Sequence, residues 1–239
     1  LFSKRETAEL IKYASNGFLA TKITFINEMA DICEKVGADV QDVAKGIGLD
    51  GRIGSKFLHP GPGFGGSCFP KDTRALAEIG KEFGARTSLI ETVIKVNEAR
   101  KIKMVKKIKE AINFIENKTI AVLGITFKPN TDDMRESPSL VIVPELLKVA
   151  KNINVYDPIG MNNAKNMSEF KGVRWKENTF SCIENTDAIV IITEWNEFRA
   201  LDLNKVKECL NEPIIIDLRN IYKHDSMKEA GIKYISVGR

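Results

Sequence analysis

The sequence predicts an α/β protein in which an all-helical first half precedes a doubly wound parallel sheet. Over residues 6–36, apolar side chains recur every three or four positions, which is typical of a long helix with apolar faces. After Asn117, short apolar runs alternate with helical segments, and this alternation predicts parallel strands joined by crossover helices. We therefore expect two domains, residues 1–100 and 101–239, linked by a long helix over residues 88–114.

The helices of the first half have recognisable boundaries. The helix over residues 6–36 ends before Gly37, and Gly17 inside it predicts that another group approaches the backbone closely. A short helix is expected over residues 40–47, followed by turn-rich chain. The next helix begins near Pro70, because a first helical residue needs no N–H of its own.

Five strands are expected in the second half. Short apolar runs mark them at residues 120–123, 153–157, 188–193, 213–218 and 233–237. Crossover helices are expected between them, notably over residues 139–151 and 204–210. The long helix that precedes the strands ends rich in lysine between Lys101 and Lys109, where a solvated face is favoured over an anion site.

The composition is that of an ordinary globular protein. The 239 residues are 43% hydrophobic and 28% charged, and the formal net charge is +4. This charge suits an anionic small molecule but is too small for a nucleic-acid-binding surface, so no nucleic-acid partner is expected. No apolar run is long enough to span a bilayer, and the first ten residues lack a signal-peptide pattern, so no membrane association is expected.

The cysteine pattern limits the chemistry further. Cys33, Cys68, Cys182 and Cys209 are widely separated and form no C-x-x-C pair. This spacing argues against a structural zinc site and a disulfide scaffold, so no metal is expected. Such cysteine usage favours a reducing cytoplasm.

The segment GPGFGGSCFPKD, residues 61–72, is the strongest candidate for a reactive site. Its glycines let the backbone approach a ligand and expose N–H groups. Cys68 lies just before Pro70, at the expected start of a helix, where the macrodipole favours a thiolate. Lys71 adds positive charge, and Asp72 follows Cys68 by one helical turn. A lone cysteine is usually a small buried filler, but these neighbours favour a reactive thiol.

A second polar pair lies on the first helix. Lys12 and Asn16 are one turn apart on one face, where an ammonium and an amide could stabilise an oxyanion or position a water. Spacing alone favours the simpler interpretation, an exposed lysine beside an ordinary helical asparagine.

Three cations follow strand ends in the second half. Lys128 and Arg135 lie after the first expected strand, and Arg219 lies after the fourth. Ligands of doubly wound sheets bind at the carboxyl ends of strands, so a phosphate-bearing ligand is expected there. Gly124 stands alone after the first strand, and the G-x-G-x-x-G fingerprint of dinucleotide sites is missing.

Segments along the whole chain resemble the nucleotide-sugar 6-dehydrogenase family. They are AELIKYASNGFLATKITFINE, DGRIGSKFL, GPGFGGSCFPKD, GITFKPNTDDMRESPS and IIDLRN, in this order. The resemblance implies a central helical dimerisation domain followed by a Rossmann-like UDP-binding domain. It also implies that the family's N-terminal NAD-binding domain is missing from this chain. The residues FGGSCFPKD are more similar to members that act on UDP-glucose than to those that act on UDP-N-acetylhexosamines.

Members of this family oxidise a sugar C6 alcohol to a carboxylate in two NAD-dependent steps, so the resemblance implies NAD as cofactor and UDP-glucose as substrate. It implies that Cys68 captures the aldehyde as a thiohemiacetal, which becomes a thioester that water hydrolyses. Lys12 would stabilise oxyanions, and Asn16 and Asp72 would hold the water and assist proton transfer.

The resemblance also implies which residues bind the ligands. The UDP-sugar would contact Arg52, Phe57, Leu58, His59, Pro60, Gly61, Pro62, Gly63, Phe64, Gly65, Phe127, Lys128 and Arg219. The nicotinamide cofactor would face Cys68, Phe69, Pro70, Lys71 and Arg135. The N-terminal helices would form a homodimer, and Arg52 would reach across it into the partner's site.

Other classes of function remain open. The chain could be a non-catalytic, dimeric UDP-sugar-binding fragment or an assembly scaffold. The joint presence of Cys68, Lys12, Asn16 and Asp72 favours the enzyme, because a scaffold needs none of them. Without an NAD-binding domain the chain alone is expected to be inactive. An unrelated thiol enzyme is disfavoured, because the sequence positions neither of its two histidines as a base.

Overall fold

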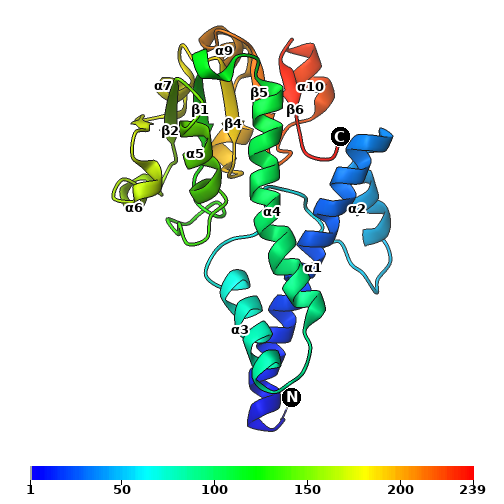
Figure 1. Cartoon of the computed structure of the whole chain (residues 1–239). Helices are drawn as coiled ribbons and strands as arrows, with labels where there is room; N and C mark the ends of the chain where they lie inside the picture. The colour runs from blue at the N-terminus through cyan, green and yellow to red at the C-terminus, as the bar shows by residue number, and fades with distance from the viewer. Residues whose placement is uncertain (1) are drawn as a thin grey trace. The chain divides into compact units, whose positions relative to one another are not determined.

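The structure is a computed structural model that describes residues 2–239 and divides into two compact units. The first unit runs to Arg100 and also takes in Gly238 and Arg239, and the second is Lys101–Val237. The division falls inside α4 (Ser88–Ala111), which begins in the first unit and ends in the second. Figure 1 shows helices alone as the regular structure of the first unit and strands in the second.

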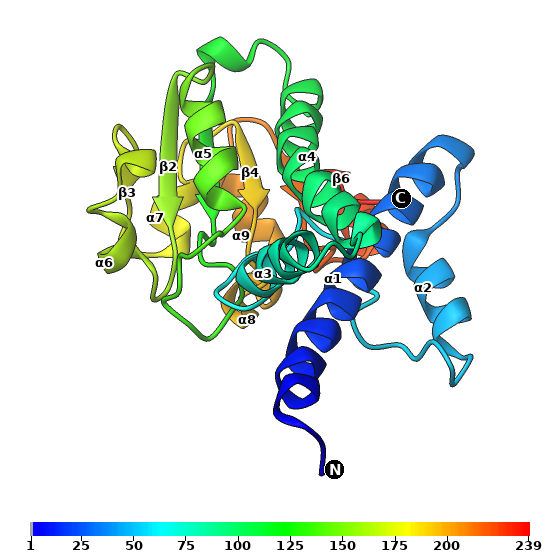
Figure 2. The same ribbon diagram turned by 60° about the horizontal axis from the view of Figure 1, so that its bottom comes forward.

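The first unit is built around one long helix. Its regular elements are α1 (Arg5–Val36), α2 (Val40–Gly48), α3 (Phe69–Glu82) and the first part of α4. Figures 1 and 2 both show α3 and α2 beside α1. Gly37 adopts a left-handed φ of 75° and ends α1, as predicted. A Cβ at Gly17 would lie 3.0 Å from Ile90 Cδ1, so the predicted close approach to this glycine is confirmed.

The second unit contains a six-stranded parallel sheet. Its strands are β1 (Thr119–Leu123), β2 (Asn152–Tyr156), β3 (Arg174–Trp175), β4 (Ala188–Ile191), β5 (Ile214–Asp217) and β6 (Lys233–Ile235). Their order in the sheet is β3-β2-β1-β4-β5-β6, so the direction of winding reverses between β1 and β4. Doubly wound sheets bind ligands at this reversal, outside the carboxyl ends of the strands. The predicted α/β fold class, helices followed by a parallel sheet, is confirmed.

Helices cover both faces of the sheet. They are α5 (Ser139–Leu147), α6 (Met161–Ala164), α7 (Thr179–Ile183), α8 (Asn196–Arg199), α9 (Leu203–Cys209) and α10 (His224–Glu229), with 3-10 turns η1 (Ile115–Asn117) and η2 (Ser168–Phe170). Figures 1 and 2 show α5 on one face and α7 and α9 on the other. Leu123 shares a buried cluster with Cys182 of α7 and Val206 of α9. Val122 faces the opposite side, because successive strand residues alternate.

The elements differ from the sequence-based expectation in several places. α5 ends at Leu147, not at residue 151, and β6 ends at Ile235, not at residue 237. α4 ends at Ala111, not at residue 114, because Phe114 turns the chain with a φ of 50°. The two-residue strand β3 is absent from the five predicted strands. It lies at the sheet edge, pairs with β2 alone and carries no apolar run, so its sequence gives no strand signal.

Candidate active site

Cys68 lies directly before the first residue of α3, as the sequence predicts. Pro70 follows in the first turn, where its missing N–H leaves no helical hydrogen bond unmade. The carbonyl of Cys68 accepts a hydrogen bond of 2.8 Å from Asp72 N, which fixes the turn between these residues. The cysteine is free and exposed, so a small buried filler does not describe it.

Asp72 joins polar residues of two helices. Its carboxylate is fully buried, and Oδ2 accepts a hydrogen bond of 2.6 Å from Asn16 Nδ2 of α1. Lys12 Nζ lies 3.4 Å from the same oxygen, and Lys71 Nζ lies 2.6 Å from Oδ1. The structure therefore brings Lys12, Asn16 and Asp72 together one helical turn after Cys68. Lys12 is 62% exposed, as the simpler interpretation expects, but the contacts with Asp72 connect both Lys12 and Asn16 to α3.

The charges around Asp72 favour its ionised form. Burial acts to raise the pKa of its carboxyl group, but hydrogen bonds from Lys71 and Asn16 and the charge of Lys12 outweigh burial. The pKa of Asp72 therefore lies below its ordinary value of 3.8. The same contact raises the pKa of the Lys71 ammonium above 10.5. Two ammonium groups facing one carboxylate leave an excess of positive charge, which favours a developing oxyanion.

The segment that precedes Cys68 is irregular but buried. Leu58 is 2% exposed and Phe64 is 6% exposed. Residues 60–63 are buried between them, whereas His59 is exposed. Buried backbone of this kind needs a hydrogen-bonding partner for every polar group, and such partners hold a loop in one shape.

Aromatic rings connect this segment to α3. The Phe64 ring meets the Phe69 ring edge-on, with centroids 6.0 Å apart, and the Phe57 ring lies 5.9 Å from Phe69 on the same measure. Phe57 has a positive φ of 65°, which is rare for a bulky residue and marks a tightly constrained turn. Because Phe69 directly follows Cys68, the rings pack next to the thiol-bearing residue.

Arg52 projects from the turn after α2. Its side chain is 90% exposed, and its guanidinium Nη2 lies 2.6 Å from Asp50 Oδ2. Lys22 Nζ of α1 holds the turn by donating to Ile53 O at 2.8 Å and to Gly54 O at 3.1 Å. The turn is therefore anchored to α1, while its cation stays accessible.

In the second unit, the structure brings Phe127, Lys128 and Arg219 together at strand ends. Arg219 follows β5 and donates from Nε to Ile192 O at 2.7 Å. Its Nη2 donates to Phe127 O at 3.2 Å, and Nε lies 3.0 Å from Glu194 Oε2. Lys128 Nζ lies 5.3 Å from the centroid of the Phe127 ring. Arg219 thus ties together the segments that follow β1, β4 and β5.

Asp157, the residue after β2, was missed by sequence reasoning. Its fully buried carboxylate accepts hydrogen bonds from the backbone N–H groups of Ile125 and Gly160, each at 2.7 Å, and from Trp195 Nε1 at 3.1 Å. Backbone N–H groups after the first strand bind the pyrophosphate in dinucleotide-binding sheets. Here one such donor, the N–H of Ile125, already donates its hydrogen bond to Asp157, so this turn does not fit a dinucleotide. An acidic residue directly after the second strand was the signal that could have revealed it.

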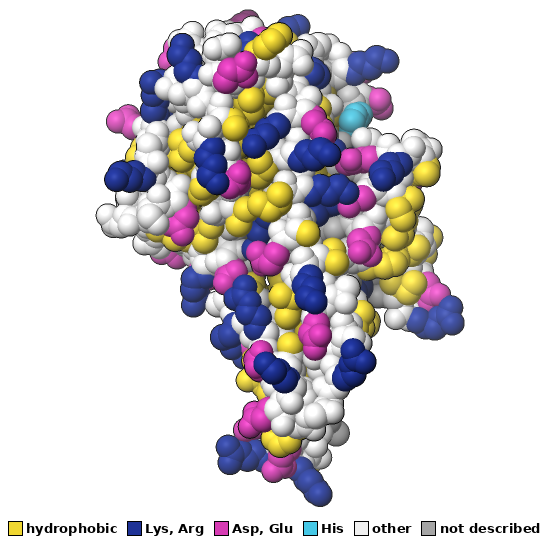
Figure 3. All heavy atoms as spheres, viewed as in Figure 1, with side chains coloured by type: hydrophobic (Ala, Val, Ile, Leu, Met, Phe, Trp, Pro, Cys, Tyr) yellow, Lys and Arg dark blue, Asp and Glu magenta, His cyan; other side chains and the backbone are white. Residues whose placement is uncertain are grey.

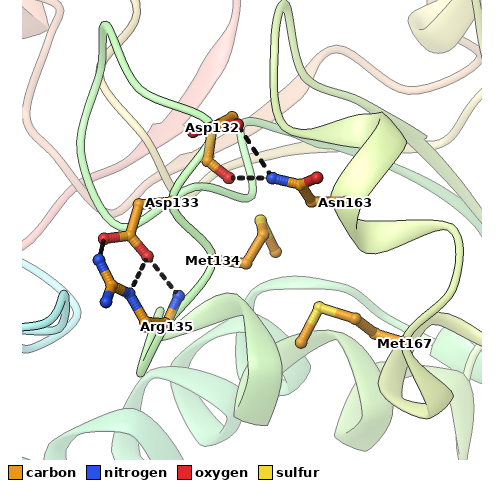
Figure 4. A pocket seen from close by; sticks show the side chains of 6 residues that line it. All are labelled: Asp132, Asp133, Met134, Arg135, Asn163 and Met167. Carbon is orange, nitrogen blue, oxygen red and sulfur yellow. Dashed lines mark hydrogen bonds and ion pairs between the residues drawn. The ribbon is translucent and has the colours of Figure 1, made fainter.

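An open pocket of about 370 Å³ lies on the loop that follows β1 (Figure 4). It is lined by Asp132, Asp133, Met134, Arg135, Asn163 and Met167. Arg135 donates from Nε and Nη2 to the two carboxylate oxygens of Asp133, at 2.9 and 2.8 Å. This contact lowers the pKa of the Asp133 carboxyl below 3.8. The predicted cofactor residue Arg135 is thus a cation paired with Asp133 at this pocket.

Within residues 2–239, no three His, Cys, Asp or Glu side chains are grouped so that they could hold a metal ion. In the same part of the chain, no helix has both the length and the apolar character needed to cross a membrane. On the face seen in Figure 3, Lys and Arg side chains are mixed with Asp and Glu rather than gathered in one basic patch.

The pairing of such a helical unit with such a parallel sheet is found in nucleotide-sugar dehydrogenases. Residues 6–99 match the central domain of the UDP-glucose/GDP-mannose dehydrogenase family, and residues 121–224 match the UDP binding domain of the same family. Together the two matches cover more than half of the chain. The chain belongs to the UDP-glucose/GDP-mannose dehydrogenase family.

Individual relatives agree with this assignment. The UDP-glucose 6-dehydrogenase of Rhizobium meliloti (strain 1021) is 54% identical over 240 residues, which cover 100% of this chain and 54% of that protein. UDP-glucose 6-dehydrogenase TuaD of Bacillus subtilis (strain 168) is 48% identical, with 98% and 50% covered. The solved structure of a UDP-glucose dehydrogenase from Pyrobaculum islandicum matches with a TM-score of 0.86 at 34% identity, covering 99% of this chain and 52% of that one. The chain spans about half the length of these relatives.

Proposed function

We propose that this chain is the catalytic and UDP-sugar-binding part of an NAD-dependent UDP-glucose 6-dehydrogenase, which oxidises UDP-glucose to UDP-glucuronate. The observation that carries the proposal is the contact of Asp72 with Asn16 and Lys12, one turn after the exposed Cys68. Relatives at 54% and 48% identity bear this name, whereas a UDP-D-ManNAc dehydrogenase from Pyrococcus horikoshii is 29% identical. This difference favours UDP-glucose over a UDP-N-acetylhexosamine.

Cys68 is the proposed nucleophile. Oxidation of the C6 alcohol yields an aldehyde, and the sulfur of Cys68 adds to its carbon to give a thiohemiacetal. Oxidation of the thiohemiacetal yields a thioester, and water hydrolyses the thioester to the carboxylate and the free thiol. The covalent bond keeps the reactive aldehyde from leaving between the two oxidations. The exposed position of Cys68 at the start of α3 supports this role.

The residues around Asp72 would assist these steps. The Lys12 side chain is 62% exposed, so its ammonium is available to stabilise an oxyanion on the substrate. Asn16 and Asp72 would hold the hydrolytic water. Because the pKa of Asp72 lies below 3.8, its carboxylate is ionised at neutral pH and can accept a hydrogen bond from that water. A carboxylate with so low a pKa is a weak base, so Asp72 would assist proton transfer by orienting the water and the Lys12 ammonium as the thioester is attacked.

NAD is the proposed cofactor, and it would accept the hydride in both oxidations. The turn after β1 does not fit it, because Asp157 occupies the N–H of Ile125. The contacts proposed for this chain are instead Cys68, Phe69, Pro70, Lys71 and Arg135. The Lys71 and Arg135 side chains are 64% and 69% exposed, so a phosphate-bearing cofactor could reach each cation beside the carboxylate with which it pairs.

Two sets of residues are proposed to contact the UDP-sugar. The sugar would meet the segment before Cys68, through Phe57, Leu58, His59, Pro60, Gly61, Pro62, Gly63, Phe64 and Gly65. The UDP moiety would meet Phe127, Lys128 and Arg219. The position of these three residues at strand ends supports a phosphate-bearing ligand there.

A homodimer through α1 is also proposed. Ile11, Phe18, Phe25 and Ile32 follow one another in steps of seven residues and are 45, 64, 44 and 51% exposed. A seven-residue step places them on one stripe of the helix, which a second copy of α1 would cover. Arg52, exposed on its anchored turn, would reach into the partner's sugar site.

The cytoplasm is the proposed compartment. All four cysteines are free, and Cys68 is exposed. A reducing compartment keeps such a thiol available as a nucleophile.

Isothermal titration of the chain tests the substrate. Binding of UDP-glucose in preference to UDP-N-acetylmannosamine and GDP-mannose is expected. Preference for UDP-N-acetylmannosamine would reassign the substrate. If none of the three ligands binds, either the rest of the protein is needed to complete the pocket, or the chain is a non-catalytic scaffold.

The catalytic role is tested by Cys68→Ser in the whole protein that contains this chain. The variant is expected to bind UDP-glucose but to form no UDP-glucuronate, because a serine hydroxyl is a far weaker nucleophile than a thiolate. Product formation at the native rate would contradict the covalent mechanism.

A further inference from the structure

A buried asparagine holds the segment that precedes Cys68. The N–H of Phe64 donates to Asn97 Oδ1 at 2.8 Å, and Asn97 Nδ2 donates back to the carbonyl of Phe64 at 3.1 Å. Asn97 lies on α4 and is 4% exposed. One side-chain amide therefore satisfies both backbone groups of a buried loop residue.

Gly61 is held in a similar way three residues earlier. Its N–H donates to Asn27 Oδ1 of α1 at 2.8 Å, and its carbonyl accepts a hydrogen bond from Arg100 Nε of α4 at 3.1 Å. Arg100 is 4% exposed and also forms an ion pair with Asp31 of α1. Both ends of residues 61–64 are therefore attached to helices by buried polar side chains.

We propose that Asn97, assisted by Arg100, is a positioning residue for the reaction. It holds residues 61–64 in the shape that receives the hexose, and it also steadies the start of α3, which carries Cys68. This inference rests on the proposed function, in which these residues bind the sugar and Cys68 attacks it.

The contacts provide a continuous path from Asn97 to the thiol-bearing residue. Asn97 fixes the backbone of Phe64, the Phe64 ring packs edge-on against Phe69, and Phe69 directly follows Cys68. Gly63 shows how closely Asn97 approaches the loop: its φ is 113°, and a Cβ there would lie 2.9 Å from Asn97 Oδ1. Displacement of Asn97 therefore frees both the loop and the ring that packs against α3.

A connection between two helices does not by itself need this arrangement. A surface loop satisfies its backbone groups with water, and buried polar networks contribute little net stability. What such a network does provide is one defined geometry. Fixed geometry is what a sugar site needs, because a small displacement of the bound carbon from the nucleophile slows the reaction strongly.

The test uses two variants of Asn97 and a matched control in the same chain. Asn97→Ala removes both hydrogen bonds, and Asn97→Asp keeps an acceptor for the N–H of Phe64 but cannot donate to its carbonyl when ionised. Asn220 is the control, because it pairs with both backbone groups of Val237 in the same manner, at 2.9 and 2.8 Å, in the second unit. If Asn97→Ala proves unfolded by circular dichroism, Asn97→Asp replaces it in both measurements.

The first measurement compares the binding of UDP-glucose and UDP by titration calorimetry. Asn97→Ala is expected to weaken UDP-glucose binding about tenfold while it changes UDP binding by less than about twofold. Asn220→Ala is expected to leave the ratio of the two affinities unchanged. A variant of Asn97 that weakens both ligands equally, or neither, would overturn the role in sugar positioning.

The second measurement, amide hydrogen exchange, does not depend on the substrate. In Asn97→Ala the amides of Phe64 and Asp72 are expected to exchange about tenfold faster, the latter because its bond to Cys68 O closes the first turn of α3. In Asn220→Ala both rates are expected to stay unchanged. If the native chain binds neither ligand but these amides respond, this chain alone does not form the UDP-glucose site, and the positioning of α3 stands. If the Asp72 amide does not respond, the path to Cys68 is wrong, even in a chain that binds UDP-glucose.

Discussion

Asn16 and Asp72 lie 56 residues apart in the sequence, and a hydrogen bond of 2.6 Å joins their side chains. Asn16 belongs to α1, and Asp72 belongs to the first turn of α3. Because Asp72 is fully buried, the contact is possible only where the two helices pack together. The hydrogen bond therefore joins α1 to α3. Asp72 is also the residue around which the charged side chains near Cys68 are grouped.

Replacement of Asp72 by asparagine is expected to destabilise the chain by about 1–2 kcal/mol. The volume is kept, but the charge that Lys12 and Lys71 face is lost. The effect stays moderate because both ammonium groups are mostly exposed and regain water. Urea unfolding followed by circular dichroism measures it, with the exposed Asp132→Asn as control. A loss no larger than that of the control would contradict the importance of the network.

The contribution of Asp72 to stability is expected to be lost at acid pH. Because its pKa in the folded state is below 3.8, its contribution is complete above that value and is lost as the pH falls through the folded pKa. For Lys71 the sign is opposite: its contribution is complete below 10.5 and is lost as the pH rises through a higher folded pKa. The free energy of unfolding, measured from about pH 2 to about pH 7, is expected to fall less steeply toward acid in Asp72→Asn. Equal slopes would assign the acid dependence to other carboxyl groups.

Gly63→Ala is expected to destabilise the chain by about 1–3 kcal/mol. A φ of 113° is strained for alanine, and the new methyl group would press on Asn97 Oδ1. Gly46→Ala is the control, because it lies within α2 with nothing within 4 Å of a Cβ, and it is expected to stabilise by about 0.5–1 kcal/mol. Thermal unfolding compares the two, and equal stabilities would show that the loop can relax around a side chain.

Phe18→Lys is expected to convert a dimer into a monomer, because it places a charge in the apolar stripe of α1. Phe83→Lys changes a phenylalanine that is 78% exposed just after α3 and is expected to leave the assembly unchanged. Sedimentation velocity measures both variants. A native chain that is already monomeric, or a Phe18→Lys variant that stays dimeric, would rule out dimerisation through this stripe.

Much of the local structure could be predicted from the sequence. The three-to-four periodicity identified α1, Gly37 marked its end, and the short apolar runs marked five of the six strands. β3 could not be found in this way, because an edge strand of two residues has no apolar run. The glycines before Cys68 and the proline after it, Pro70, correctly predicted that Cys68 lies at the start of a helix.

The sequence by itself determined features that depend on neighbouring residues: the helices and strands, the turns that need glycine, and the position of Cys68 at the start of α3. The tertiary structure alone decided which distant residues meet. Spacing along α1 favoured an ordinary exposed Lys12 beside a helical Asn16 and gave no sign that both contact Asp72. Asn97 likewise forms a hydrogen bond with Phe64, which lies 33 residues earlier in the sequence. Such contacts depend on which helix faces pack together, and helical periodicity specifies the apolar faces of each helix but not the partner that covers them.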